Sequence, residues 1–429
     1  MEITGSQLII NSLIEEGVDK IFAYPGGYDK DIFDALYHEK DIELILPRHE
    51  QGLIHAAEGY ARSTGKVGVC LVTSGPGATN LVTGIADANY DGIPLVCFTG
   101  QVATSVIGND AFQEVDIVGI TRTICKYSTT IRKREDLGRV IKEAFYIART
   151  GKPGPVVVDL PSNIVSEFGP SEYPKSVDIR GYKPSTGVHI GQIKKALEML
   201  KGAKKPLFLI GGGVNISRAN EELEKLVDIT NVPVITTIMG KGAIPTSHPL
   251  FIGNVGMHGS YAANRAVNEC DVLFSIGTRF NDRVTGKISE FAPNAKIIHI
   301  DIDSASISRN IVVNIPIVAD AKNAIKELIP LAEKLNTKQW VDEIKTWDKK
   351  HPVTAPSSVE GFISPQSIFE NLNKVFTDGI FVTDVGQHQM WTTQFLEMNK
   401  NKQLITSGGL GTMGFGLPAA IGAINVTER

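Results

Sequence analysis

The chain has 429 residues, enough for about two to four domains, and its 43 basic residues nearly balance 47 acidic ones. It contains no basic run of the kind that binds a phosphate backbone, so nucleic acid is not expected as a partner. The four cysteines lie far apart without metal-ligand spacing, no apolar run could span a bilayer, and residues 1–6 carry no signal sequence. We therefore expect a cytoplasmic protein that does not enter a membrane.

Residues 1–165 alternate between predicted helices and strands, the pattern of a parallel sheet with helices on both faces. The predicted elements are helix 6–16, strand 20–23, helix 29–37, strand 42–46, helix 52–62, strand 67–73, helix 78–90, strand 94–99 and, further on, the buried strand 156–160, which closes the unit. Residues 166–187 contain Pro, Ser and Gly without a sustained period and are predicted to be a linker.

A second α/β domain is predicted over 188–340, beginning with helix 191–200 and strand 206–210. Residues 341–363 include Pro352 and Pro356 and are predicted to be a second linker. The third unit, 364–429, is predicted to contain strand 379–383, a helix from 388, strand 403–406 and helix 412–423, about half of a usual domain. The expected fold is α/β, with three doubly wound parallel-sheet domains of which the last is incomplete.

Glu50 is the most informative residue of the chain. It follows the predicted strand 42–46 and opens a helix rich in small residues. A carboxylate in a tight apolar crevice has a raised pKa and can share a proton with a bound heterocycle, as thiamine diphosphate (ThDP) enzymes require. The alternative is that Glu50 only caps the following helix.

Glycine-rich turns carry the next signals. Residues 74–80 follow a strand and open a helix, so they either approach an anion or serve close packing. Gly211-Gly212-Gly213 has the position of a dinucleotide phosphate turn. Asp301 and Asp303 follow strand 296–300, where a carboxylate can bind a ribose, and Arg279 and Arg283 flank the end of strand 272–276, where they can pair with a diphosphate. The alternative is a ligand-free Rossmann-like domain with surface ion pairs.

Longer motifs resemble the catalytic subunits of acetolactate synthases (acetohydroxyacid synthases), a family of ThDP-dependent carboligases. The resemblance runs from about residue 4 to the last residue. Its motifs are Tyr24-Pro25-Gly26-Gly27, Pro47-Arg48-His49-Glu50, residues 73–80, Asp110-Ala111-Phe112-Gln113-Glu114, residues 256–259, residues 279–283, residues 299–303, residues 384–391 and residues 407–414.

The resemblance implies a pyrimidine-binding domain, a Rossmann-like middle domain and part of a diphosphate-binding domain. Glu50 would contact the pyrimidine N1′, the Gly411 carbonyl would accept the 4′-amino group, and Met413 would support the bent cofactor. Phe112 and Gln113 would reach the substrate. The remaining ThDP contacts would come from Tyr24, Gly26, Val385, Gly386, Gln387 and His388. FAD would lie against Lys152, Gly212, Gly213, Thr237, Met239, His258, Gly277, Arg279, Arg283, Asp301 and Asp320.

The reaction implied by the resemblance decarboxylates pyruvate and joins the hydroxyethyl unit to a second 2-oxo acid, pyruvate or 2-oxobutyrate, in branched-chain amino acid biosynthesis (valine and isoleucine). A homodimer or tetramer is implied, and a regulatory small subunit is compatible with the family. Two alternatives stay open: another ThDP-dependent lyase or decarboxylase, and an inactive nucleotide-binding fragment.

Several residues depart from the family pattern. Tyr28-Asp29-Lys30 stands where small or apolar residues are usual, which places a large ring near the substrate channel. Lys152 replaces a usual arginine near the flavin, and a lysine lacks the planar fork of arginine. Ser162 and Asn281 replace a frequent lysine and a frequent aspartate.

The chain ends at 427–429, near the point where the family's Mg²⁺-binding Gly-Asp-Gly turn would begin. The diphosphate of ThDP needs such a hard, oxygen-ligated cation. The expectation is therefore a truncated chain that contains no metal ligand, binds no ThDP by itself and is inactive alone.

Overall fold

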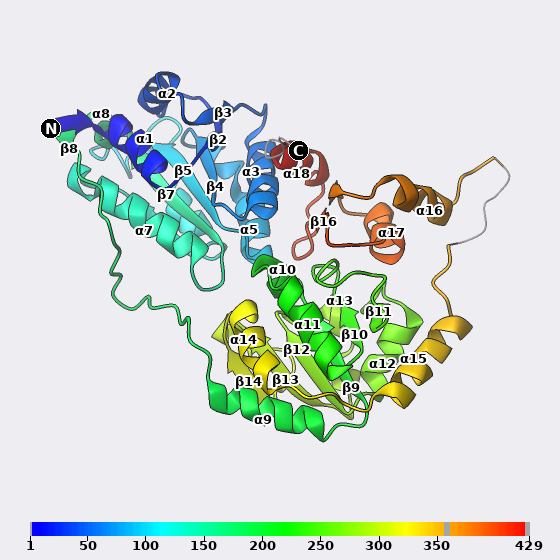
Figure 1. Ribbon diagram of the computed structural model, residues 1–429. Coiled ribbons are helices and arrows are strands. Elements are labelled where there is room, and N and C mark those ends of the chain that lie inside the picture. Colours follow the sequence, from blue (N-terminus) through cyan, green and yellow to red (C-terminus); the bar gives the residue numbers. More distant parts are fainter. Residues whose placement is uncertain (1, 356–360, 425–429) are drawn as a thin grey trace. The chain divides into compact units, whose positions relative to one another are not determined.

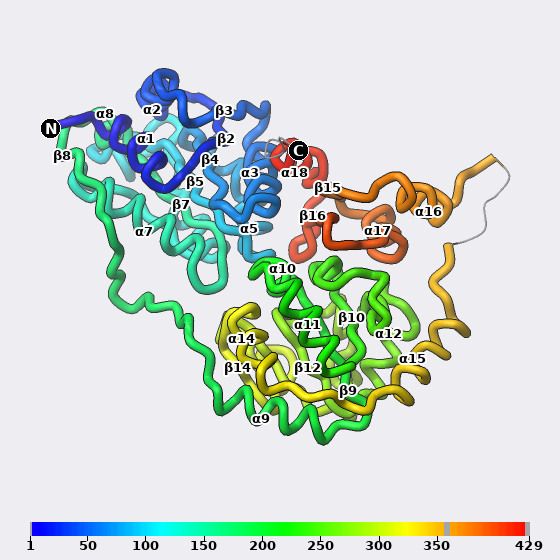
Figure 2. The backbone as a smooth tube through the Cα atoms, in the orientation of Figure 1, coloured from blue at the N-terminus to red at the C-terminus, as the bar shows by residue number. Residues whose placement is uncertain are grey.

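The computed structural model describes residues 2–355 and 361–424 (Figure 1). These residues form two compact units. Unit 1 combines residues up to 184 with the segment from 409 onward, and unit 2 comprises residues 185–408. Figure 2 follows the chain from its blue start through the green and yellow middle to the red end, which belongs to unit 1 again.

The core of unit 1 is a six-stranded sheet in which every described pairing is parallel. In spatial order its strands are β3 (Glu43–Ile45), β2 (Lys20–Tyr24), β4 (Gly68–Val72), β5 (Leu95–Gln101), β7 (Pro155–Pro161) and β6 (Tyr127–Thr130). Strand β7 is buried throughout, as expected, but it does not close the sheet, because β6 pairs with it and forms the edge. Successive side chains point to opposite faces, so β4 directs Val69 and Leu71 to one core and Cys70 and Val72 to the other.

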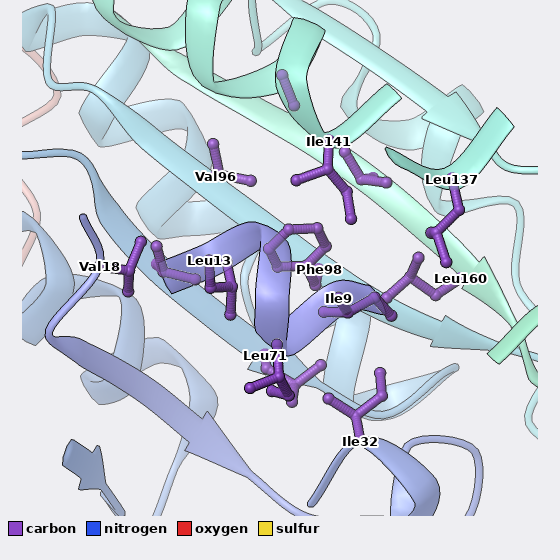
Figure 3. Close-up of a cluster of buried hydrophobic side chains, with 14 of the residues drawn as sticks. Ile9, Leu13, Val18, Ile32, Leu71, Val96, Phe98, Leu137, Ile141 and Leu160 are labelled. Carbon is purple, nitrogen blue, oxygen red and sulfur yellow. The ribbon is translucent and has the colours of Figure 1, made fainter. Parts of the chain in front are cut away.

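Helices cover both faces of this sheet. The helices of unit 1 are α1 (Gly5–Glu15), α2 (Lys30–Tyr37), α3 (Glu50–Thr64), α4 (Pro76–Thr79), α5 (Val82–Asp91), α6 (Ile117–Thr121), α7 (Leu137–Arg149), α8 (Ser162–Ser166) and α18 (Gly416–Ile424), with a 3₁₀ turn at Arg134–Asp136. Helices α1, α2 and α7 pack on one face, where the side chains of Leu13, Phe98 and Ile141 meet (Figure 3). Helices α3 and α5 pack on the other.

Helix α18 packs against α3 at glycine contacts. A Cβ added to Gly59 would lie 2.0 Å from the Ala419 carbonyl oxygen, and one added to Gly422 would lie 1.8 Å from that of Ala56. The two backbones therefore touch, and only glycine at these positions allows the helices to come so close.

Three segments of unit 1 differ from the sequence expectation. The helix predicted over 78–90 is divided into α4 and α5 by a turn at Asn80–Leu81, and the side-chain amide of Asn80 is directed to Glu50. The last helix begins at Gly416 rather than 412, because Gly411 and Gly414 before it have left-handed φ angles of 71° and 85°. The predicted linker 166–187 begins with strand β8 (Phe168–Pro170), which pairs antiparallel with β1 (Glu2–Thr4).

Unit 2 contains a second six-stranded sheet whose described pairings are all parallel. Its strands, in spatial order, are β11 (Phe251–Asn254), β10 (Val234–Thr236), β9 (Pro206–Ile210), β12 (Val272–Ile276), β13 (Lys296–Asp301) and β14 (Ile315–Val318). Its helices are α9 (Ile190–Lys201), α10 (Gly212–Ile216), α11 (Asn220–Thr230), α12 (Tyr261–Glu269), α13 (Asp282–Thr285), α14 (Ala321–Leu328) and α15 (Lys338–Lys350), with 3₁₀ turns at Ile288–Glu290, Ser304–Ser306 and Ile329–Leu331.

Helix α15 corrects the expectation of an open linker from residue 341. Trp340 and Ile344 are buried in the core between α12 and the sheet, and the Trp340 indole N–H donates to the Pro206 carbonyl at 3.0 Å. The apolar face of this polar-looking helix is therefore part of the packing of unit 2.

Residues 361–408 also belong to unit 2. They form α16 (Pro365–Val375), α17 (Gln387–Phe395) and a parallel pair of strands, β15 (Gly379–Val382) and β16 (Lys402–Ile405). Lys241 is buried beside them and donates from Nζ to the Thr393 carbonyl in the last turn of α17, at 2.9 Å. Burial lowers the pKa of Lys241 to about 7. Within the described ranges, no helix is both long and apolar enough to cross a bilayer.

Candidate active site and nucleotide site

Glu50 lies at the start of α3, just past the carboxyl end of strand β3. The helix is capped by His49, whose Nδ1 accepts the Gln51 N–H at 3.1 Å, so the alternative of Glu50 as the cap is wrong. The half-buried Glu50 side chain instead accepts a hydrogen bond at Oε2 from Asn80 Nδ2 at 2.9 Å. One carboxylate oxygen is thus fixed, and the group is still within reach of solvent.

The 74–80 turn packs next to the Glu50 side chain. Gly75 has φ 56°, and a Cβ there would lie 2.7 Å from the Gln113 carbonyl oxygen. A Cβ at Gly77 would lie 2.9 Å from the Thr73 methyl group and 3.6 Å from Glu50 Oε1. Close packing therefore requires both glycines, and no side chain stands between Gly77 and that carboxylate oxygen.

Tyr24 and Gly26 lie at the same edge of the sheet, at the end of β2. A Cβ added to Gly26 would lie 2.3 Å from Thr73 Cβ, whereas a Cβ added to Gly27 would meet nothing within 4 Å. The turn after β2 is thus packed on one side and open on the other, and the open side could accept a bound ring.

The loop that carries Phe112 and Gln113 reaches this edge from the end of β5. Gln113 has φ 59°, and the Phe112 ring is 80% exposed. The Tyr28 hydroxyl donates to the Phe112 carbonyl at 3.1 Å. The structure therefore brings Glu50, Gly26 and the Phe112–Gln113 pair around one turn, residues 73–80.

Gly411 and Met413 belong to the segment that precedes α18 in unit 1. The Met413 side chain is 79% exposed, and Gly411 has φ 71°. The neighbouring Thr412 hydroxyl donates to Asp87 Oδ1 at 3.3 Å, which anchors the segment to α5.

A buried polar group supports α3 and could be mistaken for a metal site. His55, Glu58 and Asp87 offer ligand atoms within 4.8 Å of one another. However, the Arg62 guanidinium lies 3.4 Å from Glu58 and 3.9 Å from Asp87, and 2.8 Å from Asp91. Burial, together with repulsion by Asp87, raises the pKa of Glu58 well above its ordinary value. A cation already lies among these carboxylates, so the donors fit an ion-pair network rather than Mg²⁺.

The second candidate region is the carboxyl edge of the unit 2 sheet. The strand order reverses between β9 and β12, and ligands of doubly wound sheets bind outside such a point. Gly213 N–H donates to the Gly277 carbonyl at 3.0 Å, and a Cβ at either residue would lie 2.7 Å from the other's Cα. A Cβ added to Gly212 would lie 2.9 Å from the Cβ of Met239. The glycines thus let the turn after β9 pack directly against the turn after β12 and against Met239.

The remaining residues expected at a flavin follow successive strands of the same edge, except one. Along this edge lie His258 after β11, Thr237 after β10, Arg279 and Arg283 after β12, Asp301 at the end of β13 and Asp320 after β14. Asp320 caps α14 by accepting the Asn323 N–H at 3.0 Å, and Asp301 accepts the Asp303 N–H at 2.9 Å. Lys152 instead lies in unit 1, just before β7, at the amino edge of that sheet and away from Glu50.

Val385, Gly386, Gln387 and His388 lie between β15 and the first turn of α17. Gly386, with φ 147°, precedes the helix, so the first N–H groups of α17 point out of its amino end. Gln389 donates from Nε2 to the hydroxyl of Thr406, the residue after β16, at 2.7 Å, which holds the start of α17 beside that strand. Such a helix terminus favours an anionic group.

Sequence reasoning missed two residues at the first site. Asn80 was assigned only to the glycine turn, although an amide after a strand-to-helix turn could have signalled a side-chain donor. Asp29 was noted only as a departure, but its side chain is fully buried and accepts the Gly26 N–H at 2.7 Å. Burial raises the pKa of Asp29 to about 6.

Comparisons with known proteins identify the families to which the chain is similar. Three families match: "Thiamine pyrophosphate enzyme, N-terminal TPP binding domain" over residues 3–120, the central domain over 193–328, and the C-terminal TPP binding domain over 384–427. Thiamine pyrophosphate is another name for ThDP.

Similar proteins extend over almost the whole chain. The acetolactate synthase large subunit of Buchnera aphidicola (Schizaphis graminum) is 49% identical over 98% of this chain and 75% of its own length. The acetolactate synthase isozyme 3 large subunit of Escherichia coli K12 is 46% identical with the same coverage. The probable acetolactate synthase large subunit of Methanocaldococcus jannaschii is 49% identical over 98% of this chain and 73% of its own length.

Proposed function

The chain belongs to the acetolactate synthase large subunits, and we propose that it joins two 2-oxo acids with ThDP bound beside Glu50. The observation that supports this most is the Glu50 carboxylate, which Asn80 holds by one oxygen at 2.9 Å and which opens onto the 74–80 turn. The first 2-oxo acid is pyruvate, and the second is pyruvate or 2-oxobutyrate.

Glu50 is proposed as the acid–base group. ThDP, when bound, supplies a ring carbon that attacks the carbonyl of the 2-oxo acid. Glu50 would exchange a proton with the pyrimidine N1′, and Asn80 would keep the carboxylate in one rotamer for that transfer. Gly411 and Met413 are proposed to contact the pyrimidine and the bend of the cofactor.

Phe112 and Gln113 are proposed to act on the substrates. The exposed Phe112 ring could cover an apolar methyl group, and the Gln113 amide could donate to a carboxylate. Both come from the loop that packs against Gly75, and Gly77 of the same turn lies next to Glu50. This proximity would keep the reacting carbon close to the residue that moves the proton.

The other cofactor contacts are proposed at two further places, the amino end of α17 and the carboxyl edge of the unit 2 sheet. The amino end of α17, with Val385 to His388, suits the diphosphate, and Mg²⁺ would serve as its counter-ion. The carboxyl edge of the unit 2 sheet, beside the turns of Gly212, Gly213 and Gly277, suits FAD, with Arg279 and Arg283 for its diphosphate and Asp301 for its ribose. No described residue is proposed as a metal ligand.

The subunit assembly and the location of the protein are also proposed. The relatives are named large subunits, which is compatible with a regulatory small subunit here. A homodimer or tetramer in the cytoplasm is proposed from the resemblance, and the near-neutral charge balance argues against a nucleic acid partner.

The test of the reaction is Glu50→Gln in an enzyme that binds ThDP and Mg²⁺ and forms acetolactate. The amide keeps the size of the side chain but cannot exchange the proton, so acetolactate formation from pyruvate should fall by about 10²–10⁴-fold at an unchanged melting temperature. Glu43→Gln, at the exposed edge strand next to it, is the matched control. If Glu50→Gln formed acetolactate at nearly the wild-type rate, Glu50 would not be the group that exchanges the proton.

A further inference from the structure

The turn from Gly26 to Asp29 is held in place by hydrogen bonds. The buried Asp29 carboxylate accepts the Gly26 N–H at 2.7 Å, and its backbone carbonyl accepts the N–H groups of Ile32 and Phe33 at 3.0 and 3.2 Å. The Tyr28 N–H contacts the Thr73 hydroxyl at 3.4 Å. The turn is therefore attached to α2 through Asp29 and to Thr73, just after β4, through Tyr28.

The side chain of Tyr28 crosses from this turn to the 108–114 loop. A Cβ added to Gly100 at the end of β5 would lie 3.3 Å from Tyr28 Cβ, so the glycine leaves the room that residue 28 occupies. At the far end of the ring, the hydroxyl donates to the Phe112 carbonyl at 3.1 Å. The ring thus bridges two segments that are 84 residues apart.

The 108–114 loop is closed mainly by its own groups. Glu114 accepts the N–H groups of Gly108 and, at 2.9 Å, Ala111, and these bonds lower the pKa of its carboxyl. Asp110 and Gln113 have left-handed φ angles of 52° and 59°. In the described parts of the chain, Tyr28 makes the one side-chain hydrogen bond that reaches residues 108–114 from outside the loop.

We propose that Tyr28 is a positioning residue, whose hydroxyl holds the Phe112–Gln113 peptide and thereby sets where these two side chains meet the 2-oxo acid. This inference rests on the proposed function of Phe112 and Gln113. A closed loop with left-handed residues keeps its shape but can swing as a body, and a bond at the Phe112 carbonyl restrains that movement at its tip.

The first arm of the test measures the loop itself, without catalysis. Tyr28→Phe removes only the hydroxyl, so amide hydrogen exchange of peptides covering 105–116 in the full chain should accelerate by about two- to tenfold. Strands β4 and β5 should keep their wild-type exchange. Tyr37→Phe, which removes a hydroxyl from an 85% exposed ring on α2, is the matched control and should change neither. Unchanged exchange over 105–116 in Tyr28→Phe overturns the proposal.

The second arm measures the use of substrate by the holoenzyme. Tyr28→Phe should raise the KM for the 2-oxo acid by about two- to tenfold and by more than it lowers kcat, because a looser loop binds the acid less well. A faster-exchanging loop with an unchanged KM overturns the positioning role. If Tyr28→Phe behaves as expected while Glu50→Gln remains active, the assignment of Glu50 fails and that of Tyr28 stands.

Discussion

Asp29 is a carboxylic acid that the fold places where its charge is unfavourable. Its side chain is fully buried under the Gly26 turn, and burial raises its pKa from 3.8 to about 6. The folded state therefore favours the protonated form. The stability that protonation provides is complete below about pH 4 and is lost as the pH rises through about 6.

Asp29→Asn should remove this dependence on pH. The amide keeps the acceptor oxygen for the Gly26 N–H and cannot ionise, so the variant should gain stability relative to wild type between pH 4 and pH 7.5. A shift of about two pKa units corresponds to roughly 3 kcal/mol, or roughly 5 °C or more in melting temperature. The measurement is the melting temperature at both pH values, with Asp34→Asn on the exposed side of α2 as the control. An equal difference at both pH values would contradict the prediction.

At the scale of elements, the contact between α3 and α18 depends on the absence of side chains. In an isolated helix, alanine is favoured over glycine by about 1 kcal/mol. At Gly59 the new methyl group would meet the Ala419 carbonyl at 2.0 Å, so the steric conflict outweighs that preference.

Gly59→Ala should therefore destabilise unit 1 by roughly 1–3 kcal/mol and loosen α18. Gly52→Ala lies on the same helix, and its methyl group would meet only the Pro418 side chain at 3.7 Å, an ordinary contact. This control should be neutral or slightly stabilising. Thermal melts and limited proteolysis of residues 409–424 compare the two variants. If Gly59→Ala and Gly52→Ala were equally stable, the backbones of α18 and α3 would not be in close contact at Gly59.

The regular elements of the chain could be predicted well because their patterns are local. Strands β9 and β12 were predicted with their observed bounds, since each is an apolar run between polar or turn residues. Helix α15 was missed because its buried face consists of a few residues, Trp340, Val341 and Ile344, within a highly charged stretch. The edge strand β6 was missed as well, because its residues are half-exposed and mostly polar.

The candidate site was predictable in position but not in its contacts. Parallel strands bring their carboxyl ends to one edge, so Gly26, Glu50 and the 74–80 turn could be expected together. The bond from Asn80 to Glu50 joins residues 30 positions apart, and that from Tyr28 to Phe112 joins residues 84 apart. Such pairings depend on tertiary geometry, and no local pattern encodes them.

At the scale of the whole molecule, the two units have separate hydrophobic cores. The residues proposed for FAD lie in unit 2, apart from Lys152. Unfolding should therefore occur in more than one step, and the flavin should act on one of them.

FAD at about 100 times its Kd should raise the transition of unit 2 by about 2.7 kcal/mol and leave that of unit 1 nearly unchanged. Calorimetry with and without FAD measures this. Gly277→Ala should abolish the effect by crowding Gly213, whereas Gly286→Ala, with a similar φ of 57° and open space around it, should keep it. No shift in either transition at high micromolar FAD would contradict the flavin site.

The return of the chain to unit 1 has a consequence for biosynthesis. Helix α3 is made early, but α18, which covers part of it, follows only after the about 220 residues of unit 2. At 5–20 residues per second, translation of that insertion takes about 10 to 45 s. During this time the ribosome-bound nascent chain exposes the α3 surface around Ala56 and Gly59. This surface is therefore where a chaperone would engage the half-made protein, and the contact between α3 and α18 should be among the last to form.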